Sequence, residues 1–199
     1  MDSVSIYAVS LINLFVAARS WVLIYKKRVQ PSLAMWLFFL IAISVSLFTY
    51  LKDGDFRFQD NILNVADLFM AGSIVICILL FGEKSTRFNR FDTFCLSFVM
   101  VILFFWIITR NHFISNILMQ LIMVIAYFPT YNRLIVTRKN SESFTVWISM
   151  LTASLVALIS TKGLLAQIYV WRAIICIVFL LGFMTWLTYS QVINKKNRR

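Results

Sequence analysis

The stretch FPTYNRLIVTRKNSESFTVW, residues 128–147, decides the fold, because an earlier stretch of the chain repeats it loosely. The earlier copy is AARSWVLIYKKRVQPSLAMW, residues 17–36, and the offset that aligns Trp36 with Trp147 is 111 residues. Other matches at this offset are Leu23/Leu134, Ile24/Ile135, Lys27/Arg138, Arg28/Lys139, Ser32/Ser143, Leu40/Leu151 and Ala42/Ala153. A duplicated helix, basic turn and helix in an apolar chain is typical of transporters built from two repeats.

Composition indicates the medium in which the chain folds. Of its 199 residues 61% are hydrophobic and only 14% are charged, which leaves too little polar surface to cover one soluble domain. A spanning helix needs roughly 20 apolar residues, and this template predicts seven spans. They are Val4 to Tyr25, Leu33 to Leu51, Ile62 to Phe81, Thr93 to Thr109, Ile114 to Val136, Phe144 to Thr161 and Leu164 to Tyr189.

The distribution of basic residues predicts the orientation. The chain carries a net charge of +11, and its Lys and Arg residues divide unequally between the two ends of the predicted spans. Thirteen lie at one end: Lys26, Lys27, Arg28, Lys84, Arg87, Arg90, Arg133, Arg138, Lys139, Lys195, Lys196, Arg198 and Arg199. Four lie at the other: Lys52, Arg57, Arg110 and Lys162. By the positive-inside rule the first end is cytoplasmic, so we expect the amino terminus outside and the carboxyl terminus inside.

The same residues argue against several other functions. The basic residues flank membrane spans, so we expect contact with lipid head groups and no nucleic-acid partner. Cys77, Cys95 and Cys176 lie in apolar segments without motif spacing, and the only His is His112, so no metal site or cofactor is expected. No phosphate-binding glycine loop or catalytic cluster is visible, and we expect that the protein is not an enzyme.

The repeat predicts the order of the helices. Three spans reverse the direction of the chain, so a second three-span unit in the same orientation needs one extra crossing, which the fourth predicted span supplies. We therefore expect an all-α integral membrane protein with seven transmembrane helices as two parallel three-helix bundles joined by a linker helix. The expected units are residues 1–82, a linker of residues 83–111, and residues 112–199 with the basic tail.

This plan resembles the SWEET and PQ-loop superfamily of seven-helix membrane transporters. The segment from Phe128 to Trp147 is similar to the PQ-loop pattern, with a helix-kinking proline, Pro129, followed by a basic turn and an aromatic residue that opens the next helix. The earlier copy keeps the turn but has Ala18 in place of the proline. Neither copy contains the Pro-Gln dipeptide for which the pattern is named. The resemblance implies a substrate site between the two bundles near the midplane, with Pro129 as a gating residue.

Polar residues inside the predicted spans are the candidate substrate-binding groups, because polar side chains are costly against lipid. Asn64 and Asp67 share one face of the third span with Asn61, and Arg172 lies in the comparable half of the seventh. We expect Asp67 and Arg172 to meet across the interface, either as a structural ion pair or as groups that handle substrate or a proton.

Three further residues are candidates to line the central cavity. Gln120 and Tyr127 on the fifth span, with Trp21 on the first, are the additional substrate-binding candidates. For Trp36 and Trp147, which begin their helices, we favour an ordinary role as interfacial anchors.

The functional hypothesis is a transporter of a small polar solute, a sugar or similar metabolite, working by alternating access between the two bundles. The alternative is a non-transporting PQ-loop-type membrane module that binds lipid or protein cargo. The expected location is a membrane, with the cell membrane favoured. The expected partners are the solute and membrane lipids, and a homo-oligomer stays open.

The orientation is directly testable by thiol labelling in a chain without its three native cysteines. A Cys placed after Asn194 should react with an impermeant reagent only after the cytoplasmic face is opened, because the basic end is expected inside. A Cys placed within residues 52–60 should react from outside in intact cells. Labelling with the opposite pattern would overturn the orientation.

Overall fold

The computed structural model describes residues 2–53, 55–83, 88–108 and 111–196, and all regular structure in these ranges is helical. The elements are α1 (Asp2–Tyr25), α2 (Leu33–Lys52), the short 3₁₀ helix η1 (Phe58–Asn61), α3 (Ile62–Phe81), α4 (Arg90–Ile108), α5 (His112–Ile125), α6 (Tyr127–Thr137), α7 (Phe144–Ala157) and α8 (Leu164–Lys196). The prediction of an all-helical chain is confirmed.

Six of the helical segments in the described residues are long and apolar enough to cross a membrane. The helix Phe144–Ala157 is apolar but shorter than these six. It ends four residues before the end of the predicted sixth span. Large apolar side chains cover the outer surface of the bundle, as at Phe69, which is 73% exposed, and Phe179, which is 70% exposed. Such a surface is stable when it faces lipid.

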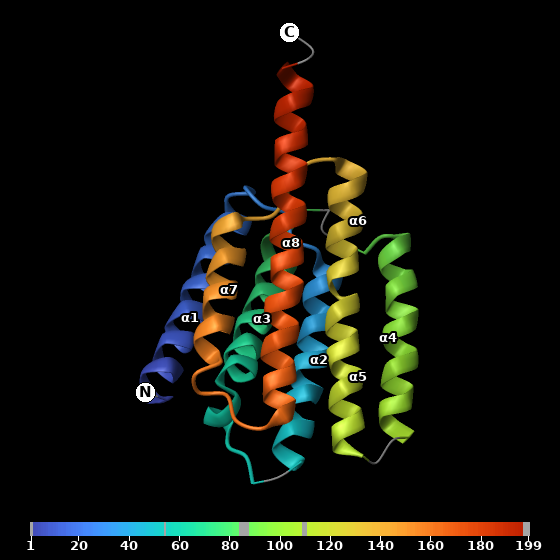
Figure 1. Cartoon of the computed structure of the whole chain (residues 1–199). Coiled ribbons are helices and arrows are strands. Elements are labelled where there is room, and N and C mark those ends of the chain that lie inside the picture. The colour runs from blue at the N-terminus through green and yellow to red at the C-terminus, as the bar shows by residue number, and fades with distance from the viewer. Residues whose placement is uncertain (1, 54, 84–87, 109–110, 197–199) are drawn as a thin grey trace.

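The helices run as a bundle with the connections gathered at its two ends (Figure 1). We call the end with the α1–α2 and α6–α7 turns and the last residues of α8 the basic end. The opposite end, with the start of α1 and the α2–α3 and α7–α8 connections, is called the acidic end for Asp53, Asp55 and Asp60. Of the basic residues that predict the orientation, Lys84, Arg87, Arg110, Arg198 and Arg199 lie outside the described residues.

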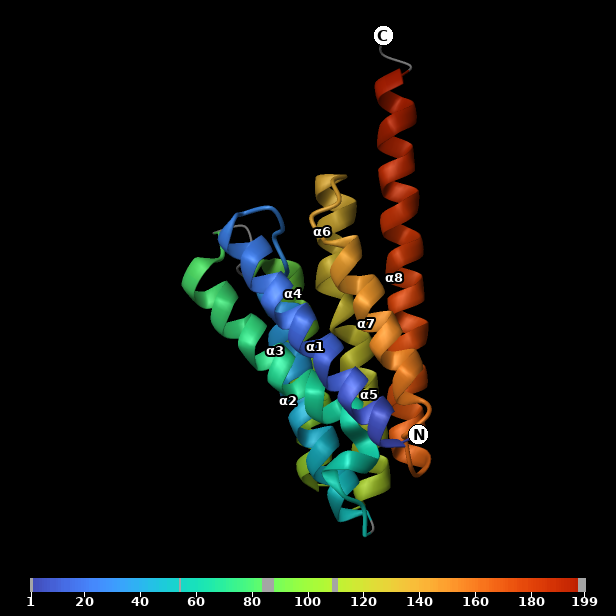
Figure 2. The ribbon, with the colours of Figure 1, turned by 90° about the vertical axis from the view of Figure 1, so that its left-hand side faces the viewer.

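Packing between helices places α2 and α3 near the centre and α4 at the edge. Helix α3 packs against both α1 and α2, α8 packs against α7 and α5, and α1 and α2 contact α7 and α5 respectively. Helix α4 rests mainly on α5 and buries few side chains. Helix α8 continues past the other helices at the basic end (Figure 2), and it ends seven residues beyond the predicted seventh span.

The two basic turns of the sequence repeat have the same local structure. Lys27 and Arg138, which align at the 111-residue offset, both adopt a left-handed backbone, with φ of 53° and 49°. This conformation ends a helix and is uncommon for residues other than glycine. Ser32 and Ser143, also aligned, cap the next helix by accepting a hydrogen bond from the backbone amide three residues on.

The predicted fifth span is divided into α5 and α6 by a break at Ala126. Pro129 follows three residues later and is buried on α6. A proline has no amide hydrogen and its ring clashes with the carbonyl four residues before it, here that of Ile125. The interruption therefore follows from the proline.

Replacing Pro129 with Ala restores the missing donor, so we expect the free energy of unfolding to rise by about 1 kcal/mol or more. If the break also serves as a hinge, conformational exchange in the same variant will slow. Pro31→Ala, outside any helix, is the control that restores no helical hydrogen bond. A Pro129→Ala protein that is less stable and exchanges at the unmutated rate would contradict this account.

Candidate functional site

A narrow cavity of about 20 Å³ lies inside the bundle, and we call it the central cavity. Its polar lining includes Asp67 from α3, Ser154 from α7, and Tyr169 and Arg172 from α8. Trp36 from α2 and Tyr127 from α6 supply two of its aromatic walls. A volume of this size holds roughly one water molecule, so the cavity is closed in this structure.

Tyr169 connects the two charged residues of the central cavity. Its hydroxyl donates a 2.8 Å hydrogen bond to Oδ2 of Asp67. The guanidinium carbon of Arg172 lies 4.7 Å from the centre of the Tyr169 ring, which is cation–π distance. Asp67 and Tyr169 are each the sixth residue of their helices, α3 and α8, which explains why they meet at one depth.

The predicted ion pair between Asp67 and Arg172 is not formed in the described part of the chain, where the ion pair found joins Lys162 to Asp60. Arg172 instead donates from Nε to Oε1 of Gln120 at 3.3 Å. The hydroxyl of Tyr169 is a neutral donor that satisfies the Asp67 carboxylate without bringing the two charges into contact. The prediction was right that both residues face one cavity and wrong about direct pairing.

A buried hydrogen-bond network continues from Arg172 toward the acidic end. The Gln120 amide donates to Oγ of Ser46 at 3.1 Å and to Oδ1 of Asn116 at 3.0 Å. Asn116 donates in turn to the backbone oxygen of Ser46 at 2.9 Å, and Asn64 donates to Oγ of Ser46 at 3.2 Å. Side chains of α2, α3, α5 and α8 are thereby joined, because buried polar groups in an apolar bundle need partners.

The acidic end is closed by contacts between the α2–α3 and α7–α8 connections. Nζ of Lys162 lies 2.9 Å from Oδ1 of Asp60, and the Tyr50 hydroxyl donates to the backbone oxygen of Lys162 at 2.9 Å. The Phe56 ring stacks on Tyr50 with 4.8 Å between centroids. Gly163 has a φ of 83°, and a Cβ there would lie 2.7 Å from the Phe56 ring, so only glycine fits this turn.

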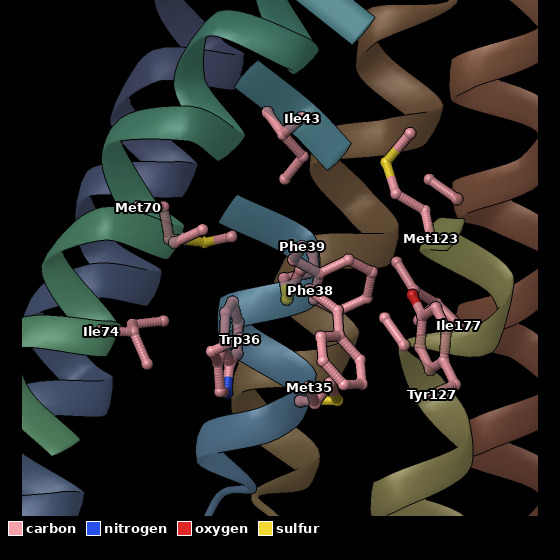
Figure 3. Close-up of a cluster of buried hydrophobic side chains, with 14 of the residues drawn as sticks. Met35, Trp36, Phe38, Phe39, Ile43, Met70, Ile74, Met123, Tyr127 and Ile177 are labelled. Atoms are coloured by element: carbon pink, nitrogen blue, oxygen red, sulfur yellow. The ribbon is translucent and has the colours of Figure 1, made fainter. Parts of the chain in front are cut away.

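The basic end is closed by two tryptophans. Trp36 and Trp147 stack with 6.3 Å between centroids and 23° between their planes. Both are buried, with 3% and 0% exposure, so the expectation that they are interfacial anchors was wrong. Figure 3 shows Trp36 between Ile74 of α3 on one side and the side chains labelled Phe38 and Phe39 on the other, with Tyr127 beyond them. Trp147 also lies 5.9 Å from Tyr127 between ring centroids.

Glu142, in the turn before α7, holds one of these tryptophans. Its Oε2 accepts a 3.2 Å hydrogen bond from Nε1 of Trp147. Burial raises the pKa of Glu142 to about 7, while the Trp147 hydrogen bond and the charge of Arg133 act in the opposite direction. The carboxyl group therefore titrates near neutral pH.

The predicted site residues fall into three groups. Asp67, Arg172 and Tyr127 line the central cavity, and Gln120 and Asn64 belong to the adjoining network. Trp21 lies elsewhere, with its indole nitrogen donating to the backbone oxygen of Ser73 at 3.1 Å. Pro129 is buried on α6.

The sequence analysis missed the roles of Trp36, Trp147, Tyr169 and Glu142. The alignment of Trp36 with Trp147 at the 111-residue offset was an available signal, since both residues begin a helix after a similar basic turn. Tyr169 is the sixth residue of α8, as Asp67 is the sixth residue of α3. No comparable signal marks Glu142, whose repeat counterpart is Pro31.

Nothing in the described residues suggests a metal centre, since no group of three or more His, Cys, Asp or Glu side chains gathers there. No protein-family model, no curated protein and no solved structure matches the chain.

The geometry predicts which side chains are energetically coupled. In a double-mutant cycle, Asp67→Asn and Tyr169→Phe should show a coupling free energy of about 1–2 kcal/mol, because a buried charge-assisted hydrogen bond is lost. The cycle of Asp67→Asn with Arg172→Gln should give a smaller value. Unfolding in mixed detergent measures both.

Tyr127→Phe is the matched control, since it removes a tyrosine hydroxyl from the same cavity without touching the Asp67 hydrogen bond. A coupling between Asp67 and Arg172 that exceeds the coupling between Asp67 and Tyr169 would contradict the geometry.

Proposed function

We propose that the protein is a membrane transporter for a small polar solute, which binds in the central cavity and crosses by alternating access. The observation that carries this proposal is a set of charged and polar groups, the buried Asp67 and Tyr169 beside the half-buried Arg172, inside an apolar bundle that is closed toward both ends. Ionisable groups at such depth are costly, and a function in solute or ion passage gives a reason to keep them.

The pattern of helix packing supports two related three-helix units with α4 as the linker. Helix α1 packs on α3 as α5 packs on α8, and α2 packs on α3 as α7 packs on α8. Across the interface α1 contacts α7, and the equivalent pair is α5 with α2. These correspondences are those expected for a parallel repeat about an axis along the membrane normal.

Contacts between aligned residues support an axis through the basic end. Trp36 and Trp147 stack on one another, and the amide of Gln30 donates to the backbone oxygen of its counterpart Ser141 at 3.0 Å. In this plan the Trp36–Trp147 pair is the inner gate and the Asp60–Lys162 contact belongs to the outer gate. Rocking of one unit against the other opens one gate while the other stays closed.

The chemistry of the cavity favours a solute with hydroxyl or charged groups. The carboxylate of Asp67 can accept hydrogen bonds from hydroxyl or ammonium groups, and Arg172 can donate to a carboxylate or hydroxyl. Aromatic walls from Trp36 and Tyr127 suit the apolar face of a sugar ring. A sugar or similar small metabolite fits these groups, in line with the resemblance to SWEET and PQ-loop proteins, with the basic end in the cytoplasm.

One observation favours the second candidate, a non-transporting module that binds lipid. An open groove of about 590 Å³ runs between α6 and α8 near the basic end, far larger than the central cavity. Its walls are mainly apolar, with Trp186 and Phe183 beside Arg138. An acyl chain with an anionic head group matches this combination.

Uptake into proteoliposomes separates the two functions. We expect a panel of radiolabelled monosaccharides and small polar metabolites to include at least one that enters vesicles containing the protein and not empty vesicles. Asp67→Asn should keep the fold and reduce concentrative uptake at least about tenfold, because the carboxylate is lost from the site. Trp21→Phe, away from the cavity, is the control that should retain uptake.

Absence of flux for the whole panel, with retained binding of anionic lipid, would contradict transport and favour the module. Full uptake by Asp67→Asn would remove Asp67 from the site.

A further inference from the structure

The turn layer at the basic end contains polar atoms that are buried and have no hydrogen-bond partner among the described residues. They include Nε of Arg19, Nε1 of Trp36, Oγ of Ser141 and Oε1 of Glu142. Unpartnered buried polar atoms are rare in folded proteins and each one is costly. Others lie elsewhere, at Asn13, Asn61, Asn64 and Asp92, but two of the four named here belong to Trp36, which closes this end, and to Glu142.

A second small cavity lies within this layer, and we call it the basic-end cavity. It measures about 20 Å³, and its polar lining consists of Ser20, Trp36, Glu142 and Ser143. This volume accepts one water molecule, which could bridge the indole N–H of Trp36 and the free carboxyl oxygen of Glu142. Trp36 also lines the central cavity, so its ring separates the two cavities.

Glu142 thus contacts one member of the tryptophan pair and lies across a small cavity from the other. It accepts directly from Trp147 and shares the basic-end cavity with Trp36. No other acidic side chain lines either cavity apart from Asp67. A change in the charge of Glu142 therefore acts on the contact that closes the basic end.

The charged groups around Glu142 come from several elements. Arg133 of α6 is close enough to influence it electrostatically, and Asp92 of α4 acts in turn on Arg133. Arg133 also donates to the backbone oxygen of Gln30, whose side chain donates to Glu83 at 2.7 Å. Arg19 of α1 precedes the cavity-lining Ser20, whereas α2 and α3 contribute Trp36 and Ile74, which carry no charge.

We propose that Glu142 is a proton-binding site that controls the opening of the Trp36–Trp147 gate, an inference that rests on the proposed transport function. With its proton, the neutral carboxyl group stays buried beside the two tryptophans and the basic end is closed. Loss of the proton to the solvent at the basic end leaves a carboxylate, which moves toward water and releases Trp147. Opening of this end is then coupled to proton release.

The direction of the coupling follows from linkage. Burial raises the pKa of Glu142 from 4.5 to about 7, so the buried arrangement binds the proton more tightly than a hydrated one does. The stabilisation of the closed arrangement by the proton is complete below about pH 4.5 and is lost as the pH rises through about 7. Alkaline conditions at the basic end therefore favour opening.

Accessibility of a single introduced thiol tests this site without any substrate. Ser20→Cys, in a chain lacking its three native cysteines, places the reporter in the basic-end cavity, where Ser20 is 5% exposed. Its rate of modification by a maleimide, divided by that of a Lys139→Cys reporter on the exposed turn, corrects for thiol ionisation. Between pH 6 and pH 8 this ratio should rise about tenfold, as for one group titrating near 7.

Glu142→Gln, which imitates the neutral acid, should give a low ratio that does not change with pH. Glu83→Gln, which changes a second acidic residue at the same end, should keep the tenfold rise. A rise retained in Glu142→Gln, or a flat ratio in the unmutated protein, overturns the proposal. If Glu142→Gln fails to fold, infrared spectroscopy of the unmutated protein provides the test. The band of a protonated carboxylic acid should be present at pH 6 and should disappear by pH 8. A spectrum without this band at pH 6 would also overturn the proposal.

The outcome for Glu142 and the outcome for transport are separable. A pH-dependent ratio in a protein that moves no solute would leave the proton site standing and remove the transport function. Solute uptake with a flat ratio would do the reverse.

Discussion

The stack of Trp36 on Trp147 is the contact on which the rest of the structure depends. It joins the start of α2 to the start of α7, and it separates the cavity that contains Asp67 from the cavity beside Glu142. Two large buried aromatic rings contribute several kcal/mol of packing free energy. Their removal would leave a continuous path from the central cavity to the basic end.

Polar groups determine how the remaining helices must be arranged. Ser46, Asn116 and Gln120 satisfy one another between α2 and α5, and Tyr169 satisfies Asp67 between α3 and α8. Because lipid offers no alternative partners, each group fixes the rotation of its helix toward the interior. Some buried polar atoms have no partner among the described residues, and those of Trp36 and Glu142 lie where we propose that movement occurs.

Local features were largely predictable from the sequence, whereas contacts between distant segments were not. The bounds of α3, Ile62–Phe81, were predicted, since apolar length and the following Gly82 mark them, and Pro129 signalled the break between α5 and α6. Placing Tyr169 between Asp67 and Arg172 required the relative depth of α3 and α8, which depends on the length of the preceding connections. The burial of Trp36 depends on α7, which lies more than a hundred residues away in the chain.

The central claim, alternating access about the Trp36–Trp147 contact, is tested most directly by distances between paired spin labels in lipid nanodiscs. One pair would occupy Lys27 and Lys139 at the basic end, and the other Phe58 and Leu164 at the acidic end, all of them exposed positions. The account predicts a shorter and a longer distance between the labels at each end. Conditions that increase the fraction of molecules with the longer distance at the basic end should decrease that fraction at the acidic end. A single unchanging distance at both ends would contradict it.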